Sequence, residues 1–142
     1  MGLSSKTIAL VKSTASDIEQ NAEAITIRMY EVLFNNYPET KFIFGNAASD
    51  QHKKLAALIS NYAANIDNLI VFSDAVEKMA TAHVNVDVQP QHYPMVGNSI
   101  LMAIKDVLGD VASDEVLQAW REAYFFLADI LIAREKELYS QK

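Results

Sequence analysis

The sequence predicts an all-α fold, with six or more helices packed around one core. Only four glycines and three prolines interrupt its 142 residues. Apolar residues return every three or four positions along most of the chain, as they do on the buried face of a helix. No stretch longer than about five residues alternates strictly between apolar and polar residues, which is the pattern of a half-buried strand. Helices should therefore supply almost all of the regular structure.

The N-terminal part is expected to hold two helices and a short turn. The first covers residues 4–20 and begins at Ser4, a suitable N-terminal cap. The second covers residues 22–35. Its inward stripe is expected to hold Ile25, Met29, Val32 and Leu33, beside a second stripe of Tyr30, Phe34 and Tyr37. Pro38 then opens a short helical turn that ends in the sequence FIFG.

The middle of the chain is expected to hold two more helices. Ser49 is the expected cap of the first, which runs to Ile66 with apolar residues at helical spacing and is ended by the sequence NIDNL. The second begins near Ser73 and carries acidic residues in its first turn, which suits the helix dipole. Its inner face is expected to hold Phe72, Val76, Met79, Ala80 and His83.

Two long helices are expected over residues 90–108 and 113–139. Residues 84–88 are rich in valine, but a lone strand would have no partner, so we interpret them as a connection. One side of the last helix is expected to hold Val116, Trp120, Ala123, Tyr124, Leu127, Ile130 and Leu131. No repeat, linker or low-complexity tract divides the chain, which predicts a single domain over residues 1–142.

The composition excludes several classes of function. Eighteen acidic and twelve basic residues give a net charge of -6, which argues against a nucleic-acid partner. Cysteine is absent, so thiolate metal sites and cysteine nucleophiles are excluded. The N-terminal apolar run is short and broken by Lys6 and Lys12, so we expect neither a secretory signal nor a membrane span. A cytoplasmic protein is expected.

His83 is the most informative residue, because it closes the apolar stripe of its helix and points inward. The other histidines, His52 and His92, lie at positions that look polar, and no metal-binding pair such as HExxH is present. A GxSxG nucleophile elbow and a glycine-rich phosphate loop are also missing. Two interpretations remain: an ordinary hydrogen-bonded core histidine, or the axial ligand of a cofactor that brings its own chemistry.

Five stretches decide between these interpretations. They are MYEVLFNNYPETKFIF, ANIDNL, AVEKMATAH, HYPMVGNSIL and LQAWREAYFFLADILIAREKELY. In this order and spacing the chain resembles the single-domain bacterial haemoglobins and the haem domain of flavohaemoglobins over essentially its full length. The resemblance implies a globin fold around a haem pocket, haem b (iron protoporphyrin IX) as cofactor, and His83 as the iron ligand.

The resemblance also implies roles on the gas-binding side of the haem. Tyr30 matches the tyrosine that donates a hydrogen bond to the bound gas, and Phe44 matches the phenylalanine that packs on the haem face. Gln51 and Leu55, four residues apart, match the pair that controls access and polarity. Met79 and Val96 are expected to contact the haem as well.

On the other side of the haem, Tyr93 and Glu135 match a tyrosine and a glutamate that hydrogen-bond around the ligand histidine. A carboxylate that accepts the imidazole N–H pushes electron density toward the iron and favours oxygen activation over storage. The sequence around Glu135, AREKELY, is also what a solvated helix end looks like, and Tyr93 could be a simple packing residue. Both interpretations stay open, while Trp120 is expected in the core.

Three functions are compatible with this pattern. The first is reversible oxygen binding together with conversion of nitric oxide to nitrate, with dioxygen, nitric oxide and CO as ligands. We expect no flavin-dependent reductase module within residues 1–142, so turnover would need a separate reductase. The second is a pure oxygen carrier or scavenger that supports respiration. The third is a gas sensor or a haem-free interaction domain. Phe125 and Ile132 are expected to be exposed apolar residues of the last helix, which fit a monomer or a homodimer equally.

Overall fold

The computed structural model describes residues 3–44 and 51–141, without the side chains of Phe42, Phe44 and Gln51. The chain order is α1 (Ser5–Ser13), α2 (Ala15–Asn36), η1 (Pro38–Thr40), α3 (Lys41–Phe44), α4 (Gln51–Ala64), η2 (Leu69–Phe72), α5 (Ser73–Asn85), α6 (His92–Leu108), η3 (Gly109–Val111) and α7 (Asp114–Ser140). The described residues include no strand, so the all-α prediction with six or more helices is confirmed. The expected cap Ser49 lies outside these residues.

The boundary between the first two helices was predicted in the wrong place. The break falls at Thr14, and α2 then continues through residues 20–22. The Thr14 hydroxyl donates to the Val11 carbonyl at 2.8 Å and accepts from the Trp120 indole N–H at 3.0 Å. Asn21 stays within α2 and donates its side-chain amide to the Asp17 carbonyl at 2.9 Å. The break at Thr14 thus goes with a bond to nearby backbone and one to the distant Trp120, and the continuation at Asn21 with a bond to nearby backbone. Helical periodicity registers none of these bonds.

The other helix starts follow the sequence closely. The Ser4 hydroxyl accepts from the Thr7 N–H at 3.2 Å, and the Ser113 hydroxyl accepts from the Val116 N–H at 3.3 Å. Each satisfies a backbone donor that has no partner within its helix. The helix α5 begins at Ser73 as predicted.

Residues 84–88 form the end of α5 and the turn that follows it. The helix continues to Asn85, so the first two of these residues are helical and the interpretation as a connection holds only for the rest. Asp87 has a φ of 64°, in the left-handed region. The Asp87 N–H donates to the Val84 carbonyl at 3.2 Å, and the Val88 N–H donates to the His83 carbonyl at 2.9 Å. These two bonds make a Schellman motif, the usual way in which a helix C-terminus satisfies its last carbonyls.

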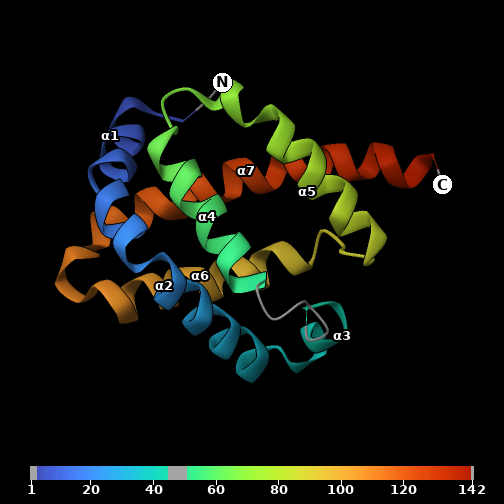
Figure 1. The fold of residues 1–142 in the computed structure, drawn as a ribbon, viewed down its shortest axis with the longest axis horizontal. Helices are drawn as coiled ribbons and strands as arrows, with labels where there is room; N and C mark the ends of the chain where they lie inside the picture. Colours follow the sequence, from blue (N-terminus) through green and yellow to red (C-terminus); the bar gives the residue numbers. More distant parts are fainter. Residues whose placement is uncertain (1–2, 45–50, 142) are drawn as a thin grey trace.

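The helices pack in crossed pairs. In Figure 1, α7 runs along the long axis of the molecule, and α5 crosses it. The helix α2 packs mainly against α4 and α6, while α1 and α5 pack mainly against α7. This arrangement encloses space between α2, α4, α5, α6 and α7.

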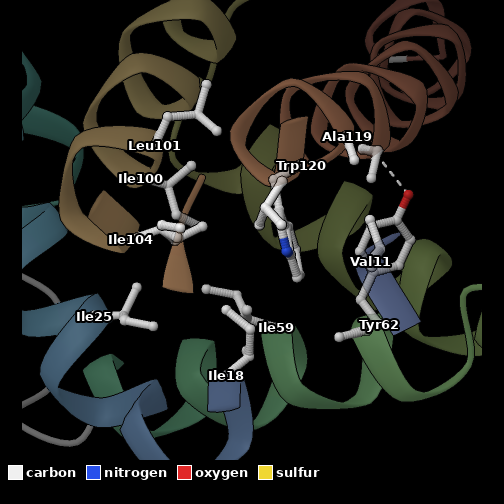
Figure 2. Close-up of a cluster of buried hydrophobic side chains, with 14 of the residues drawn as sticks. Val11, Ile18, Ile25, Ile59, Tyr62, Ile100, Leu101, Ile104, Ala119 and Trp120 are labelled. Atoms are coloured by element: carbon white, nitrogen blue, oxygen red, sulfur yellow. Dashed lines mark hydrogen bonds between the residues drawn. The ribbon is translucent and has the colours of Figure 1, made fainter. Parts of the chain in front are cut away.

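Two clusters of buried side chains stabilise the fold. The larger cluster surrounds Trp120 and includes Ile25, Ile59 and Ile104 (Figure 2). Tyr62 is also part of it, and its hydroxyl donates to the Ala123 carbonyl at 2.7 Å. The smaller cluster consists of Ala80, Val88, Tyr93, Ala128 and Leu131. Trp120 is therefore a core residue, as predicted.

One residue of the last helix was assigned to the wrong side. Ile130 was expected to face inward, but it is 39 % exposed. Phe125 and Ile132, which were expected at the surface, are half-buried and pack against the smaller cluster. The described helices include none that is both long and apolar enough to cross a membrane.

Candidate functional site

A cavity of about 520 Å³ lies between the helices. Its walls come from α2, α4, α5, α6 and α7, together with the turn after α5. The predicted site residues that line it are Tyr30, Leu55, Met79, His83, Tyr93 and Val96. The structure therefore brings together residues as far apart in the sequence as Tyr30 and Val96. Phe44 ends α3 and Gln51 begins α4, but the side chains of both lie outside the described part of the chain.

The helix α5 carries His83 to the cavity wall. His83 follows Met79 by four residues, so both side chains point to the same side of the helix. Ala80 and Val84 on α5 are buried, which fixes the rotation of the helix about its axis. The His83 side chain is 27 % exposed, so one edge of the ring remains open while the other is held by protein.

Glu135 and Tyr93 hold the ring of His83 from behind. The Nδ1 atom of His83 lies 3.0 Å from the Glu135 carboxylate and 3.0 Å from the Tyr93 hydroxyl. The Tyr93 hydroxyl in turn donates to Glu135 at 2.6 Å. An ionised carboxylate can only accept, so the proton of the imidazole is assigned to Nδ1. The Nε2 atom then carries the lone pair that a metal ion would use.

Burial keeps the phenol of this network protonated. Burial raises the pKa of Tyr93, and the hydrogen bond to Glu135 and its negative charge raise it further, so the phenol remains a donor. The Glu135 side chain is only 5 % exposed despite its place in a charged stretch of sequence. The Tyr124 hydroxyl donates to the Tyr93 carbonyl at 2.7 Å and so holds the backbone of that residue. The solvated interpretation of Glu135 is therefore wrong for this structure, because two donors surround its carboxylate.

Tyr30 lines the cavity from α2. Its ring stacks on Phe34 with centroids 5.7 Å apart, which matches the expected second stripe of that helix. Leu55 on α4 lines the cavity near the same helix, since α2 and α4 pack together. Tyr62 and Trp120 also touch the cavity, but their polar atoms are used inside the core.

Three basic residues on the cavity wall were missed by sequence reasoning. Lys54, Lys78 and His92 line the cavity, and no acidic residue does so within the described chain. His92 was assigned to a polar position, but it is half-buried, because α6 begins there and turns it inward. Its Nδ1 accepts from the Gln89 N–H at 2.8 Å, which leaves the proton of the neutral ring on Nε2. Burial lowers the pKa of His92, and the nearby charge of Glu39 partly opposes this. A histidine directly before the inward Tyr93 was the available signal.

These residues fit a haem group. The wall is mostly apolar and carries the lone pair of His83 Nε2 as well as three basic residues, Lys54, Lys78 and His92. These basic residues gather at the cavity although the chain as a whole has a net charge of -6. Haem is an apolar plate with a central metal and two carboxylates on one edge, so it needs these three kinds of contact. The described residues contain no cluster of three or more histidine, cysteine or acidic side chains that could hold a metal ion directly.

Comparison with known proteins gives consistent matches. The family model described as Globin matches residues 27–131. An uncharacterised globin-like protein of Aquifex aeolicus is 48 % identical, over 98 % of this chain and 99 % of that protein. A flavohaemoprotein of Rhodopirellula baltica is 46 % identical over 99 % of this chain, which spans about a third (35 %) of its length.

A solved structure has the same arrangement of helices. It is an engineered carbene transferase made from a protein of Rhodothermus marinus to which nitric oxide dioxygenase activity is ascribed. Its TM-score is 0.94 at 38 % identity, with 97 % of this chain and 96 % of that chain covered.

Proposed function

This chain belongs to the globin family, and from this premise we propose that residues 1–142 form one haem-binding domain that binds oxygen reversibly and oxidises nitric oxide to nitrate. The observation that carries the proposal is the contact of His83 Nδ1 with the buried carboxylate of Glu135 at the wall of an apolar cavity. A core histidine with no further task would not need a buried acid beside it, since burying a carboxylate is costly.

Each part of the wall has a task toward the cofactor, which we take to be haem b. The Nε2 atom of His83 would bind the iron, and Leu55, Met79 and Val96 would pack against the ring, with Phe44. Lys54, Lys78 and His92 would face its carboxylates. When bound, haem supplies a redox-active iron that takes up diatomic gases such as dioxygen, nitric oxide and CO.

Glu135 favours oxygen chemistry over mere storage. By accepting the Nδ1–H, it increases the electron density on the imidazole and makes Nε2 a stronger donor. Tyr93 shares the same carboxylate and limits how far it can turn. Hydrogen bonds to the other ring nitrogen of a histidine ligand set both its orientation and its basicity.

Tyr30 would act on the gas itself. A phenol in a cavity with little water can donate to a diatomic ligand as that ligand gains negative charge. Gln51, the first residue of α4, and Leu55, one turn further along, would adjust access and polarity on the same side. These two roles and that of Tyr30 rest on the resemblance together with the position of Tyr30 and Leu55 on the wall.

Turnover requires an electron from outside the domain. The overall reaction joins nitric oxide, dioxygen and one electron to give nitrate. Flavohaemoproteins, of which this chain spans about a third, are the relatives that suggest a reductase as donor. We propose a reductase outside residues 1–142, acting in the cytoplasm. An oxygen carrier is the second candidate, because it needs His83 and Tyr30 but no electron donor.

Visible spectra test the cofactor and its ligand. The purified protein, loaded with haem, should give a Soret band that shifts when the reduced form meets CO. His83→Ala should lose haem readily, and added imidazole should partly restore the spectrum because it replaces the missing ligand. His52→Ala is the matched control, since His52 is half-buried on α4 and does not line the cavity. A wild-type sample that takes up no haem would leave only the haem-free interaction domain.

Mixing the reduced, oxygen-exposed protein with nitric oxide separates the two haem functions. Stoichiometric nitrate, followed by repeated turnover with a flavin reductase and NAD(P)H, is expected for the dioxygenase. A single round of nitrate formation that no reductase can renew would assign the protein to the carrier class.

A further inference from the structure

The last two turns of α7 contact the segment around His83 at two points. Glu135 and Tyr139 are four residues apart, so they project from the same face of the helix. Glu135 holds the imidazole ring, as described above. The Tyr139 hydroxyl donates to the carbonyl of Val88 at 2.6 Å. One helix face therefore contacts both the side chain of His83 and the turn that ends its helix.

That turn is directly bonded to the backbone of His83. The Val88 N–H donates to the His83 carbonyl at 2.9 Å, across Asp87 in its left-handed conformation. Val88 is buried and forms part of the cavity wall. Its peptide groups are thus held from both sides, by His83 through the N–H and by Tyr139 through the carbonyl.

Tyr139 is suited to this contact because it stays a donor. Burial and the negative charges of Asp87 and Glu135 raise its pKa, so the hydroxyl keeps its proton through the neutral range. Gln89 donates its side-chain amide to the Tyr139 oxygen at 3.4 Å and to the Asp87 carbonyl at 3.3 Å. The hydroxyl therefore belongs to a set of bonds around one turn.

We propose that Tyr139 is a positioning residue for His83, which acts by fixing the Val88 carbonyl so that the end of α5 keeps the imidazole within hydrogen-bond distance of Glu135. The inference rests on the proposed function, because it assigns His83 as the ligand. If the Tyr139 hydroxyl is removed, the turn gains freedom, and the Nδ1–H bond to Glu135 lengthens. The electron density on the imidazole then falls, although neither Glu135 nor His83 has changed.

The test uses Tyr139→Phe, which removes only the hydroxyl, and two measurements on the haem-loaded protein. The iron–histidine stretching band of the reduced protein should move to lower frequency in resonance Raman spectra. The Val88 N–H keeps its bond to the His83 carbonyl, but the turn opens more easily once the Tyr139 bond to the Val88 carbonyl is lost. The Val88 amide should therefore exchange with solvent roughly 2- to 10-fold faster, the effect of losing one neutral hydrogen bond. Tyr37→Phe is the matched control, since the Tyr37 hydroxyl contacts Asn98 at 3.4 Å and does not line the cavity.

The two measurements separate positioning from simple stabilisation. Faster exchange with an unchanged stretching band would mean that Tyr139 supports only the turn, and would overturn the inference while leaving haem binding intact. Unchanged exchange would overturn it as well. A wild-type protein that binds no haem would overturn the proposed function, and with it any role of Tyr139 toward a ligand.

Discussion

Tyr30 and His83 reach the cavity from different helices, α2 and α5, and no helix places both. His83 is held by two residues that are not its sequence neighbours, Glu135 and Tyr93, which lie 52 and 10 positions away. The chemistry of the site therefore depends on a few side chains whose positions are set by several helices together.

Tyr30→Phe tests the gas-binding side of the cavity. The phenol would donate one hydrogen bond to bound oxygen, worth about 0.5–1.5 kcal/mol, so its loss should raise the oxygen dissociation rate roughly 2- to 10-fold. The measurement is stopped-flow displacement of oxygen by CO. Tyr37→Phe should leave the rate unchanged, because Tyr37 does not line the cavity. An equal rate in the Tyr30 variant would show that its hydroxyl serves another partner.

How well single residues could be predicted depended on where their partners lie. The inward direction of His83 follows from its own helix, so the sequence was sufficient. The burial of Glu135 was left open, because its donors belong to α5 and α6 and local sequence shows only a charged helix end. The prediction that His92 lies at a polar position was wrong for a related reason, because its inward position depends on where α6 begins.

At the scale of the helices, α6 lies close against side chains of α7 at Gly97. A Cβ atom placed there would lie 2.7 Å from Cε2 of Tyr124 and 3.2 Å from Cζ of Phe125. Tyr124 also donates to the Tyr93 carbonyl, so this contact aligns two helices that carry parts of the site. The absence of a side chain at residue 97 is what allows the packing.

Gly97→Ala should therefore destabilise the protein. The added methyl group must displace the Tyr124 ring, and overpacking of this kind costs about 1–3 kcal/mol of unfolding free energy. Urea unfolding of the variant and the wild type would measure the difference. Met102→Ala on the same helix is the control, because Met102 is 47 % exposed and should change stability by less than about 0.5 kcal/mol. A Gly97 variant as stable as the wild type would mean that the Tyr124 ring has room to move.

Helix boundaries were predictable where a capping side chain marks them, as at Ser4 and Ser113. They were wrong where a distant partner decides, as at Thr14, whose hydroxyl accepts from Trp120 106 positions away. The end of α5 shows a third case. Asp87 adopts the left-handed conformation that ends this helix. Glycine is the usual residue there, so an aspartate marks the helix end less clearly in a sequence.

For the molecule as a whole, ion pairs join helices that are distant in the chain. Arg134 on α7 donates to both carboxylate oxygens of Glu77 on α5, each at 2.8 Å. Lys12 on α1 bonds Asp67, which follows α4. The bond from Arg134 lowers the pKa of Glu77, and the bond from Lys12 lowers that of Asp67.

These shifts predict loss of stability in acid. A carboxyl group whose pKa is lower in the folded state stabilises that state above its unfolded pKa of about 4, and the contribution disappears as the pH falls through the folded pKa. Both pairs are exposed, so the effect should be small. The free energy of unfolding, measured with urea at pH 7 and at about pH 3, should differ less between the two pH values for Glu77→Gln than for the wild type. Glu23→Gln, an acid with no ion pair among the described residues, should behave as the wild type does; a Glu77 variant with an unaltered pH dependence would contradict the prediction.

The division of the interior into two clusters suggests that this protein can come apart in stages. Trp120 and its neighbours form one unit, whereas the side chains beneath His83 form another, and α7 supplies residues to both. Partial unfolding confined to the smaller unit would free His83, the proposed iron ligand, while most of the chain stayed folded. Cofactor escape and global denaturation would then be two transitions, and heating would reach the first before the second.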